Sequence, residues 1–278
     1  MDFSIIQSFD LLASTNELIG KGAFSQIFTI QETNAVIKVT SLDKESKEGK
    51  SVELDALMEV EILKTIPPHE SLVRYINHDV RSNMILTCLQ KVEGSTLTRW
   101  YLEEKIKYLD CDMRKNIVLQ LCDVLVHVHK HGYIHRDVSN NNIMCNENGR
   151  ITLIDFCFGL STNPSKRILT STTVVGTHIS SRRCQGSVGY CAPENSGRSH
   201  LITESVDAFS SVCIIFDLIA GNPAEEIGGY HDILCDEPEK FPVDENIFDK
   251  VSSFFIYCML MRGLLHQLTM NSLWMHMH

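Results

Sequence analysis

The sequence lacks any long hydrophobic run. Its longest uninterrupted apolar stretch has eight residues, Phe254 to Met261, whereas a helix needs about 18 such residues to cross a bilayer. The first residues, Met1 to Ser4, also lack the basic start and the apolar stretch of a secretory signal. We therefore expect neither membrane insertion nor export.

Basic residues are scarce relative to acidic ones. The 278-residue chain has 25 Lys and Arg against 35 Asp and Glu, which gives a net charge of −10. Proteins that bind nucleic acid or an anionic membrane surface need an excess of positive charge, so this balance argues against both kinds of partner. It leaves open an anionic ligand that is held in a locally positive pocket.

Closely spaced cysteine pairs are also missing. The ten cysteines are scattered along the chain, with no C-x-x-C motif and no dense cluster. In a chain without a secretion signal, this pattern favours reduced, mostly buried thiols and a location in the cytosol or the nucleus.

The distribution of apolar residues, which make up 44% of the chain, predicts a globular protein with two different halves. Residues 16–89 are typical of short strands around one helix, which we expect from Ser51 to Pro67. Apolar residues then recur every three or four positions from Met113 to Val128, and this helix is expected to stop at Gly132. The stretch from Val206 to Ala220 is apolar nearly all round and predicts a buried helix.

Two features of the first half indicate a site for phosphate. The segment Gly20-Lys21-Gly22-Ala23-Phe24-Ser25-Gln26-Ile27 is rich in glycine, which lets backbone N–H groups approach phosphate oxygens. Lys38 lies in an apolar strand and needs an anionic partner, because an unpaired buried ammonium is costly. Glu59 on the following helix is the best candidate, and Glu61 is the alternative that we expect to face solvent.

The second half contains further polar motifs. The long helix is followed directly by His135-Arg136-Asp137-Val138-Ser139-Asn140-Asn141-Asn142, and Asp155-Phe156-Cys157 ends a short apolar strand. Farther along, Ala192-Pro193-Glu194 closes a stretch rich in serine and threonine, and Asp207 lies near the start of the buried helix.

These motifs, in this order, resemble those of the eukaryotic protein kinase family over nearly the whole chain. The family pattern is a Gly-rich loop, a strand lysine, a helix glutamate, H-R-D-x-x-x-x-N, D-F-G and A-P-E. The resemblance implies one kinase domain over residues 1–278, with an α+β fold of two lobes. A small β-rich N-lobe would span about 14–89 and a larger, mainly α-helical C-lobe about 94–278, joined by a hinge at about 90–93.

The resemblance also implies roles for single residues, with ATP and Mg²⁺ as cofactors. Asp137 would act as the catalytic base toward the substrate hydroxyl. Lys38 would hold the phosphates of ATP and would be oriented by Glu59. Asn142 and Asp155 would hold the magnesium ions. The residues expected to contact ATP are Ile19, Gly20, Lys21, Gly22, Ala23, Phe24, Ser25, Gln26, Ile27, Val36, Lys38, Gln90, Val92 and Met144.

The expected activity is transfer of phosphate from ATP to a serine or threonine of a protein substrate. The segment from Gly186 to Glu194 resembles the serine/threonine form of the family. A tyrosine kinase would have Ala at position 139 and Arg at position 141, where this chain has Ser139 and Asn141. A pseudokinase scaffold with little or no turnover and a small-molecule kinase of the same broad fold are the alternatives.

Several positions depart from the family pattern and predict weak activity. Ser25 replaces the third glycine of the loop, Val36 the usual alanine above adenine, and Ser139 a lysine that touches the γ-phosphate. Cys157 stands where the family has glycine, and its Cβ costs about 1–2 kcal/mol if a left-handed conformation is required there.

Regulation by phosphorylation is a further expectation, in which an unidentified activating kinase or regulatory partner would act on the chain. Serines and threonines cluster between Thr170 and Ser187, in the part of the chain between Asp155 and Glu194 that phosphorylation orders in this family. Arg136, next to Asp137, would receive the phosphate.

Overall fold

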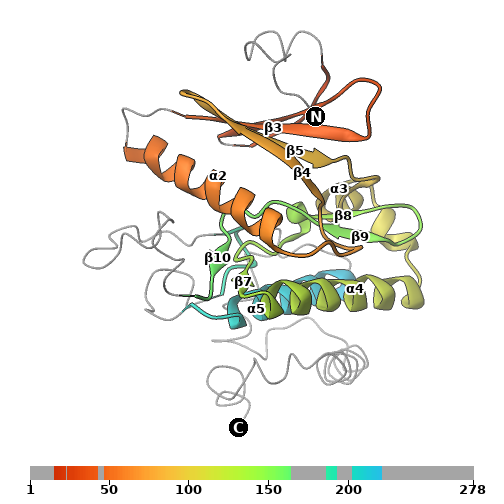
Figure 1. The fold of residues 1–278 in the computed structure, drawn as a ribbon. Coiled ribbons are helices and arrows are strands. Elements are labelled where there is room, and N and C mark those ends of the chain that lie inside the picture. The colour runs from red at the N-terminus through yellow and green to blue at the C-terminus, as the bar shows by residue number, and fades with distance from the viewer. Residues whose placement is uncertain (1–15, 23, 43–46, 164–185, 193–201, 221–278) are drawn as a thin grey trace.

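The computed structural model describes an antiparallel sheet with one long helix, followed by a mainly helical part with short strands (Figure 1). This is the two-lobed α+β architecture that the sequence predicts. The described residues are 16–22, 24–42, 47–163, 186–192 and 202–220.

A five-stranded antiparallel sheet forms most of the first lobe. Its strand order is β1-β2-β3-β5-β4, so β3 pairs with β5 inside the sheet and β4 lies at the edge. Six of the seven residues of β3 are buried, which places Lys38 in an apolar environment. The strands are β1 (Leu18–Lys21), β2 (Ser25–Thr29), β3 (Ala35–Ser41), β4 (Tyr75–Val80) and β5 (Met84–Gln90).

Helix α2 (Lys47–Thr65) lies across this sheet (Figure 1). It begins four residues before the Ser51 at which we expected it to start, because lysine and glutamate favour the helix more than Ser51 favours a cap. Met58, Ile62 and Leu63 are buried in the largest hydrophobic core. The same side of the helix therefore presents Glu59 to the interior.

The chain after α2 connects the two lobes before it enters the sheet. Strand β4 begins only at Tyr75, because the residues before it bond to β9 (Ile151–Leu153). Val73 N donates to the carbonyl of Leu153 at 3.0 Å, and Leu153 N donates to the carbonyl of Ser71 at 2.8 Å. These bonds fix α2 and the sheet relative to the second lobe.

Two long helices form the centre of the second lobe. Helix α4 (Cys111–Lys130) is capped at its N-terminus by Asp110, whose carboxylate accepts from Met113 N at 2.7 Å. The helix ends before Gly132, which has a φ of 81°. Helix α5 (Ser205–Ala220) packs against α4 and is buried along most of its length, as its composition predicts.

Short elements around these helices hold the polar motifs. Strand β6 (Ser95–Thr96) pairs with β8 (Ile143–Cys145), which pairs with β9, while β7 (Tyr133–Ile134) pairs with β10 (Leu160–Ser161). The 135–142 loop lies between β7 and β8, and Asp155 follows β9. The remaining elements are α3 (Leu97–Leu102) and the 3₁₀ turns Lys105–Tyr108 and Asn140–Asn142.

Two sequence expectations about membranes and cysteines can be compared with this fold. Among the described residues, no helix is both long and apolar enough to cross a bilayer. Cys191 is disulfide-bonded, so the expectation of reduced thiols was wrong for this residue. The spacing of cysteines does not reveal which of them the fold brings together. Free thiols are present at Cys88, Cys111, Cys122, Cys145, Cys157 and Cys213.

Candidate active site

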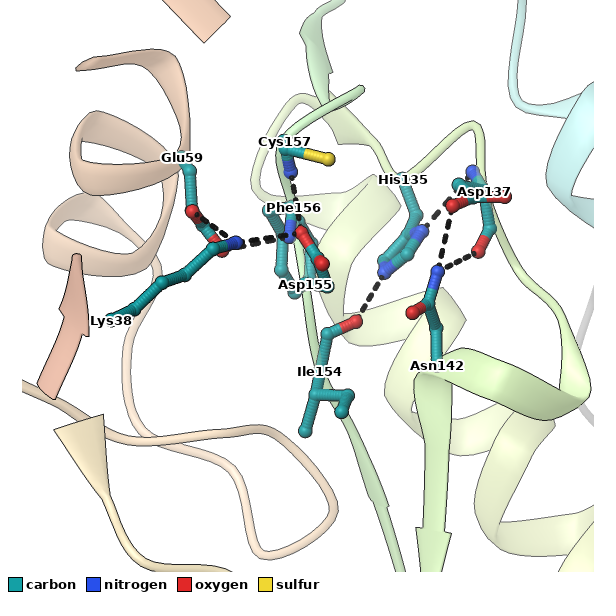
Figure 2. Close-up of polar contacts among 9 residues, drawn as sticks. All are labelled: Lys38, Glu59, His135, Asp137, Asn142, Ile154, Asp155, Phe156 and Cys157. Atoms are coloured by element: carbon teal, nitrogen blue, oxygen red, sulfur yellow. Dashed lines mark hydrogen bonds and ion pairs between the residues drawn. The ribbon is translucent and has the colours of Figure 1, made fainter. Parts of the chain in front are cut away.

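A buried ion pair joins the sheet to α2. Lys38 Nζ donates to both carboxylate oxygens of Glu59, at 2.8 and 2.9 Å, and to Asp155 Oδ1 at 2.9 Å (Figure 2). Lys38 is 5% exposed and Glu59 is 1% exposed. Glu61 is exposed and accepts from the hydroxyl of Thr65, so Glu59 is the partner, as the sequence predicts.

The charges of this cluster are set by competition between burial and attraction. Burial opposes the charged form of Lys38, but attraction to Asp155 and Glu59 outweighs it and raises the pKa of the ammonium. For Asp155, burial is likewise outweighed by Lys38, which lowers the pKa of the carboxyl to about 2. Glu59 shares the single ammonium with Asp155, and its burial raises its pKa. The ammonium of Lys38 therefore holds Asp155 in its charged form.

The backbone at Asp155 adopts a left-handed conformation. Its φ is 64°, a region that aspartate visits more readily than most residues. The next two N–H groups complete the turn, because Phe156 N donates to Glu59 Oε1 and Cys157 N donates to Asp155 Oδ1, both at 3.2 Å. Cys157 does not have a positive φ. The strain expected from its Cβ is therefore absent in this conformation.

Asp137 and Asn142 are held together at the two ends of one tight segment. Asn142 Nδ2 donates to the backbone carbonyl of Asp137 and to its Oδ2, both at 2.8 Å (Figure 2). Burial raises the pKa of Asp137, against the opposing effect of His135 and of the hydrogen bonds from Ser187. A raised pKa suits a carboxylate that has to take up a proton near neutral pH.

His135 connects the 135–142 loop to the segment that ends at Asp155. Its Nε2 lies 3.0 Å from the carbonyl oxygen of Ile154, and its Nδ1 lies 3.2 Å from the backbone N of Asp137 (Figure 2). Because a carbonyl can only accept, Nε2 carries the proton and Nδ1 accepts from Asp137. The ring also packs against buried Phe156, with centroids 4.4 Å apart. His135 thus holds the backbone of Asp137 and of Ile154 in place.

Asp207 on α5 fixes the start of the same loop. This fully buried carboxylate accepts from His135 N at 2.8 Å, from Arg136 N at 2.7 Å and from His129 Nε2 at 2.8 Å. Burial opposes its charge, but these hydrogen bonds, led by the one from His129, lower its pKa. The bonds also hold Arg136 at a φ of 67°, which a non-glycine residue rarely adopts.

Removing the Asp207 carboxylate is expected to destabilise the protein strongly at neutral pH. In Asp207→Ala the two buried backbone N–H groups of His135 and Arg136 lose their acceptor, and at about 1–3 kcal/mol each the free energy of unfolding should fall by about 2–6 kcal/mol. Because folding depresses the pKa, this stabilisation is present above about pH 4 and is lost as the pH falls further. Urea unfolding at pH 7 and pH 3.5 measures both effects, with exposed Asp112→Ala as the control. Equal unfolding midpoints for the two variants at pH 7 would contradict this role.

Ser187 contributes contacts that the sequence analysis did not predict. Its backbone N donates to Asp137 Oδ1 at 2.7 Å and its hydroxyl donates to the same oxygen at 2.9 Å. The hydroxyl also lies 3.1 Å from Ser139 Oγ. Fifty positions separate Ser187 from Asp137, so no local spacing signals the contact. A phosphate on Ser187 would add negative charge next to Asp137, and activation through this residue is therefore not expected.

Comparison with known proteins identifies the family of this chain. The family model described as the protein kinase domain matches residues 13–269. The chain belongs to the protein kinase family. Its divergence from curated relatives is large, because the identities of the similar proteins are 25–27%.

Three similar proteins illustrate this range. Serine/threonine-protein kinase PLK4 of Xenopus laevis is 27% identical over 211 residues, which cover 74% of this chain and 20% of that protein. L-type lectin-domain containing receptor kinase IX.2 of Arabidopsis thaliana is 26% identical over 227 residues, 78% of this chain and 31% of that protein. Serine/threonine-protein kinase Nek10 of Mus musculus is 25% identical over 217 residues, which cover 74% of this chain and 18% of that protein. The matched part is thus between about a fifth and a third of these relatives.

The residues expected to contact ATP lie on several elements of the kinase. The first expected contacts, Ile19 to Lys21, lie in β1, and those from Ser25 to Ile27 lie in β2. Gly22 N donates to the carbonyl of Ser25 at 2.8 Å and closes the turn, at which Phe24 is 56% exposed. Ala23 lies outside the described residues.

The apolar residues expected to contact adenine lie on both lobes. Val36 is buried in the largest core, and Ile27 and Val92 pack against that same core. Met144 lies on β8, in the second lobe, and is partly buried. Gln90 ends β5, and its N–H donates to the carbonyl of Arg74 at 2.9 Å.

The residues expected to hold Mg²⁺ have oxygen atoms to spare. Asn142 uses its Nδ2 toward Asp137, and Asp155 uses Oδ1 toward Lys38 and Cys157. Within the described residues, Asn142 Oδ1 and Asp155 Oδ2 make no hydrogen bond. Magnesium commonly takes one or two protein oxygens and completes its shell with phosphate and water. This donor set fits that pattern, although no group of three or more His, Cys, Asp or Glu in the described ranges is arranged as a self-sufficient metal site.

The expected regulatory site is only partly covered by the structure. Arg136 is buried, and the cluster from Thr170 to Ser181 lies outside the described residues, as does Glu194. Control of this kinase by phosphorylation of that cluster therefore stays a prediction.

Proposed function

We propose that this chain transfers the γ-phosphate of ATP to serine or threonine hydroxyls of protein substrates, with low turnover. The observation that supports this most strongly is the assembled ion pair between Lys38 and Glu59, with Asp155 bonded to the same ammonium. An unpaired lysine is costly in such a buried position, and the cluster places a positive charge beside the expected phosphate site.

In this proposal Lys38 holds the α- and β-phosphates and Glu59 keeps its side chain in place. Asn142 and Asp155 hold the magnesium ions, which, when bound, neutralise the charge that develops on the transferred phosphate. Gly20 and Gly22 lie in the loop that covers the phosphates, where the lack of a Cβ lets the backbone approach them closely.

The hinge in this proposal binds adenine through its backbone. The N–H groups of Gln90 and Lys91 already donate to Arg74 and Asn34, at 2.9 and 3.1 Å. Among the described backbone bonds none uses the N–H of Val92, which leaves it for the ligand. The carbonyl of Gln90 would accept from the exocyclic amine.

Asp137 acts on the substrate hydroxyl in this proposal. Asn142 holds Oδ2 of Asp137, and the Ser187 backbone and hydroxyl hold Oδ1, so the carboxylate has a fixed orientation. As the hydroxyl oxygen attacks the γ-phosphorus, the bond from this phosphorus to the β,γ-bridging oxygen breaks, ADP leaves, and the hydroxyl proton passes to Asp137. Positioning of this kind, together with charge neutralisation, accounts for most of the rate that a kinase achieves.

A pseudokinase scaffold is the second candidate, and one observation favours it. The Ser187 hydroxyl bonds to Asp137 and lies next to Ser139, at the position where the family has a lysine. In this conformation the Ser187 hydroxyl donates a hydrogen bond to Oδ1 of Asp137, the proposed base. Binding of ATP with little turnover would follow if this contact persisted.

A transfer assay with radiolabelled Mg-ATP separates the two candidates. The purified chain is incubated with a generic basic protein as acceptor, alongside Asp137→Asn and a small-molecule hydroxyl acceptor. Label on protein with the wild type alone supports the kinase. Equal labelling by the wild type and by Asp137→Asn rules out the catalytic role of Asp137. Binding of ATP without transfer supports the scaffold.

Ser139→Lys is expected to raise the turnover number by about 10- to 100-fold. A lysine at this position would add a charged hydrogen bond to the γ-phosphate, worth about 1.5–3 kcal/mol. Steady-state kinetics with saturating ATP measures the change, and Ser139→Met provides similar length without charge. A turnover that rises equally in both variants would show that release of Ser187, rather than the charge, is responsible.

The domain limits and the location also belong to the proposal. One kinase domain would span residues 1–278, with lobes at about 14–89 and 94–278 and a hinge at about 90–93. The cytosol or the nucleus is the proposed compartment.

A further inference from the structure

A cavity of about 660 Å³ lies on the side of the hinge that faces the end of α2. Its walls come from five parts of the chain: the turn between β2 and β3, the last turn of α2 and the loop after it, the start of β4, residues 90–93, and the segment from the end of β8 into β9. Lys38, Val36 and Met144 do not line it. The cavity is therefore separate from the proposed nucleotide site, although both use the hinge.

Positive charge gathers around this cavity. Lys64, Arg74 and Lys91 line it, all three are exposed, and none has a carboxylate partner among the described residues. Arg150 also lines it and pairs with Glu70 at 2.9 Å. With Glu93 as the second carboxylate, four permanent cations face two anions in a chain whose net charge is −10. Such an excess, against the overall charge, favours an anionic ligand.

The backbone behind these cations is tied together. Gln90 N donates to the carbonyl of Arg74 at 2.9 Å, and Lys91 N donates to the carbonyl of Asn34 at 3.1 Å. Val73, next to Arg74, bonds to β9, and Figure 1 shows the C-terminal end of α2 close to that strand. The points from which the cationic side chains extend are therefore fixed before any ligand binds, which lowers the entropic cost of binding.

We propose that this cavity binds a small organic polyanion that bears two or more phosphate groups. The volume lies in the range of small-molecule sites. The three unpaired cations come from separate segments, so they suit phosphates spread around a compact molecule better than one isolated phosphate. Asn34, Asn146 and Thr152 add neutral hydrogen-bonding groups to the wall.

Calorimetric titration of the full chain, without ATP or magnesium, tests the proposal. The probes are inositol hexakisphosphate, pyrophosphate and a doubly phosphorylated peptide. The wild type is expected to bind inositol hexakisphosphate more tightly than pyrophosphate, because more phosphates reach the separated cations. The Arg74→Glu/Lys91→Glu variant should bind it at least about 10-fold more weakly, a loss that corresponds to about one charged contact. Lys130→Glu, a charge reversal at one exposed position of α4, should leave the affinity unchanged.

A second variant locates the probe and keeps this test independent of the phosphotransfer proposal. Lys38→Met should retain binding of inositol hexakisphosphate, whereas a loss there would place the probe in the nucleotide site and overturn the inference. Absence of binding up to about 1 mM probe, or equal affinity in Arg74→Glu/Lys91→Glu and Lys130→Glu, would also overturn it. If the phosphorylated peptide is the only probe that binds, the cavity is a protein-docking site and the inference of a small-molecule site is overturned. If the double variant fails to fold by circular dichroism, Lys64→Ala and Arg74→Ala replace it, with the same expected direction.

Discussion

Asp137→Asn is expected to lower the turnover number by about 10²- to 10⁴-fold while the affinity for ATP changes little. The amide keeps the size and shape of the carboxylate but cannot take the proton of the attacking hydroxyl. Asp137 contacts Asn142 and Ser187 and makes no contact with Lys38, so the phosphate-binding cluster should remain intact. The expected signature is a fall in kcat with an unchanged KM for ATP.

Kinetics of phosphate transfer with varied ATP measures both parameters. Asp112→Asn, the same change at an exposed position of α4, is the matched control and should behave as the wild type. A KM for ATP that rises as much as kcat falls would show that Asp137 acts on nucleotide binding. An unchanged kcat would remove Asp137 from the reaction.

Lys38→Met is expected to abolish measurable transfer and to lower the free energy of unfolding by about 3–5 kcal/mol. Methionine has a similar length, but it leaves Glu59 buried and Asp155 largely buried without their counterion. The double variant Lys38→Met/Glu59→Leu removes the buried charge as well and should recover most of the lost stability. Its transfer activity should stay lost, because neither side chain can hold a phosphate.

The pH dependence provides a second test of the same cluster. Lys38 lowers the pKa of Asp155 to about 2 in the folded protein, against about 3.9 for an unfolded aspartate. This contribution to stability is therefore present above about pH 4 and is lost as the pH falls toward 2. The difference between the wild type and Lys38→Met should shrink over that range.

Urea unfolding of both proteins at pH 7 and at pH 3 measures these differences, with Lys21→Met as a control on an exposed strand. A loss of stability in Lys38→Met no larger than in Lys21→Met would contradict the coupling of Lys38 to two carboxylates.

The parts of the site that the sequence predicts follow from local constraints. Lys38 lies among apolar strand residues, and a buried ammonium needs an anionic partner. The helical spacing places Glu59 on the inner side of the next helix. The contact of His135 with the carbonyl of Ile154, in contrast, depends on how the segments after β7 and β9 approach each other.

Other contacts depend on packing between distant segments and could not be predicted. The Ser187 hydroxyl reaches Asp137 across 50 positions of irregular chain, and Asp207 bonds to residues 71, 72 and 78 positions away. The expectation about Cys157 failed for a related reason, because strain depends on φ and the left-handed residue is Asp155. Backbone conformation within a tight turn is not specified by residue type alone.

The most direct measurement of the central claim is magnesium-dependent transfer of labelled γ-phosphate by the purified chain, followed by identification of the labelled amino acid in the acceptor protein. We predict phosphoserine or phosphothreonine that increases linearly with enzyme concentration and disappears in Asp137→Asn. A folded wild-type protein that binds ATP but labels no acceptor above the level of Asp137→Asn would contradict the proposal and leave the scaffold as the function.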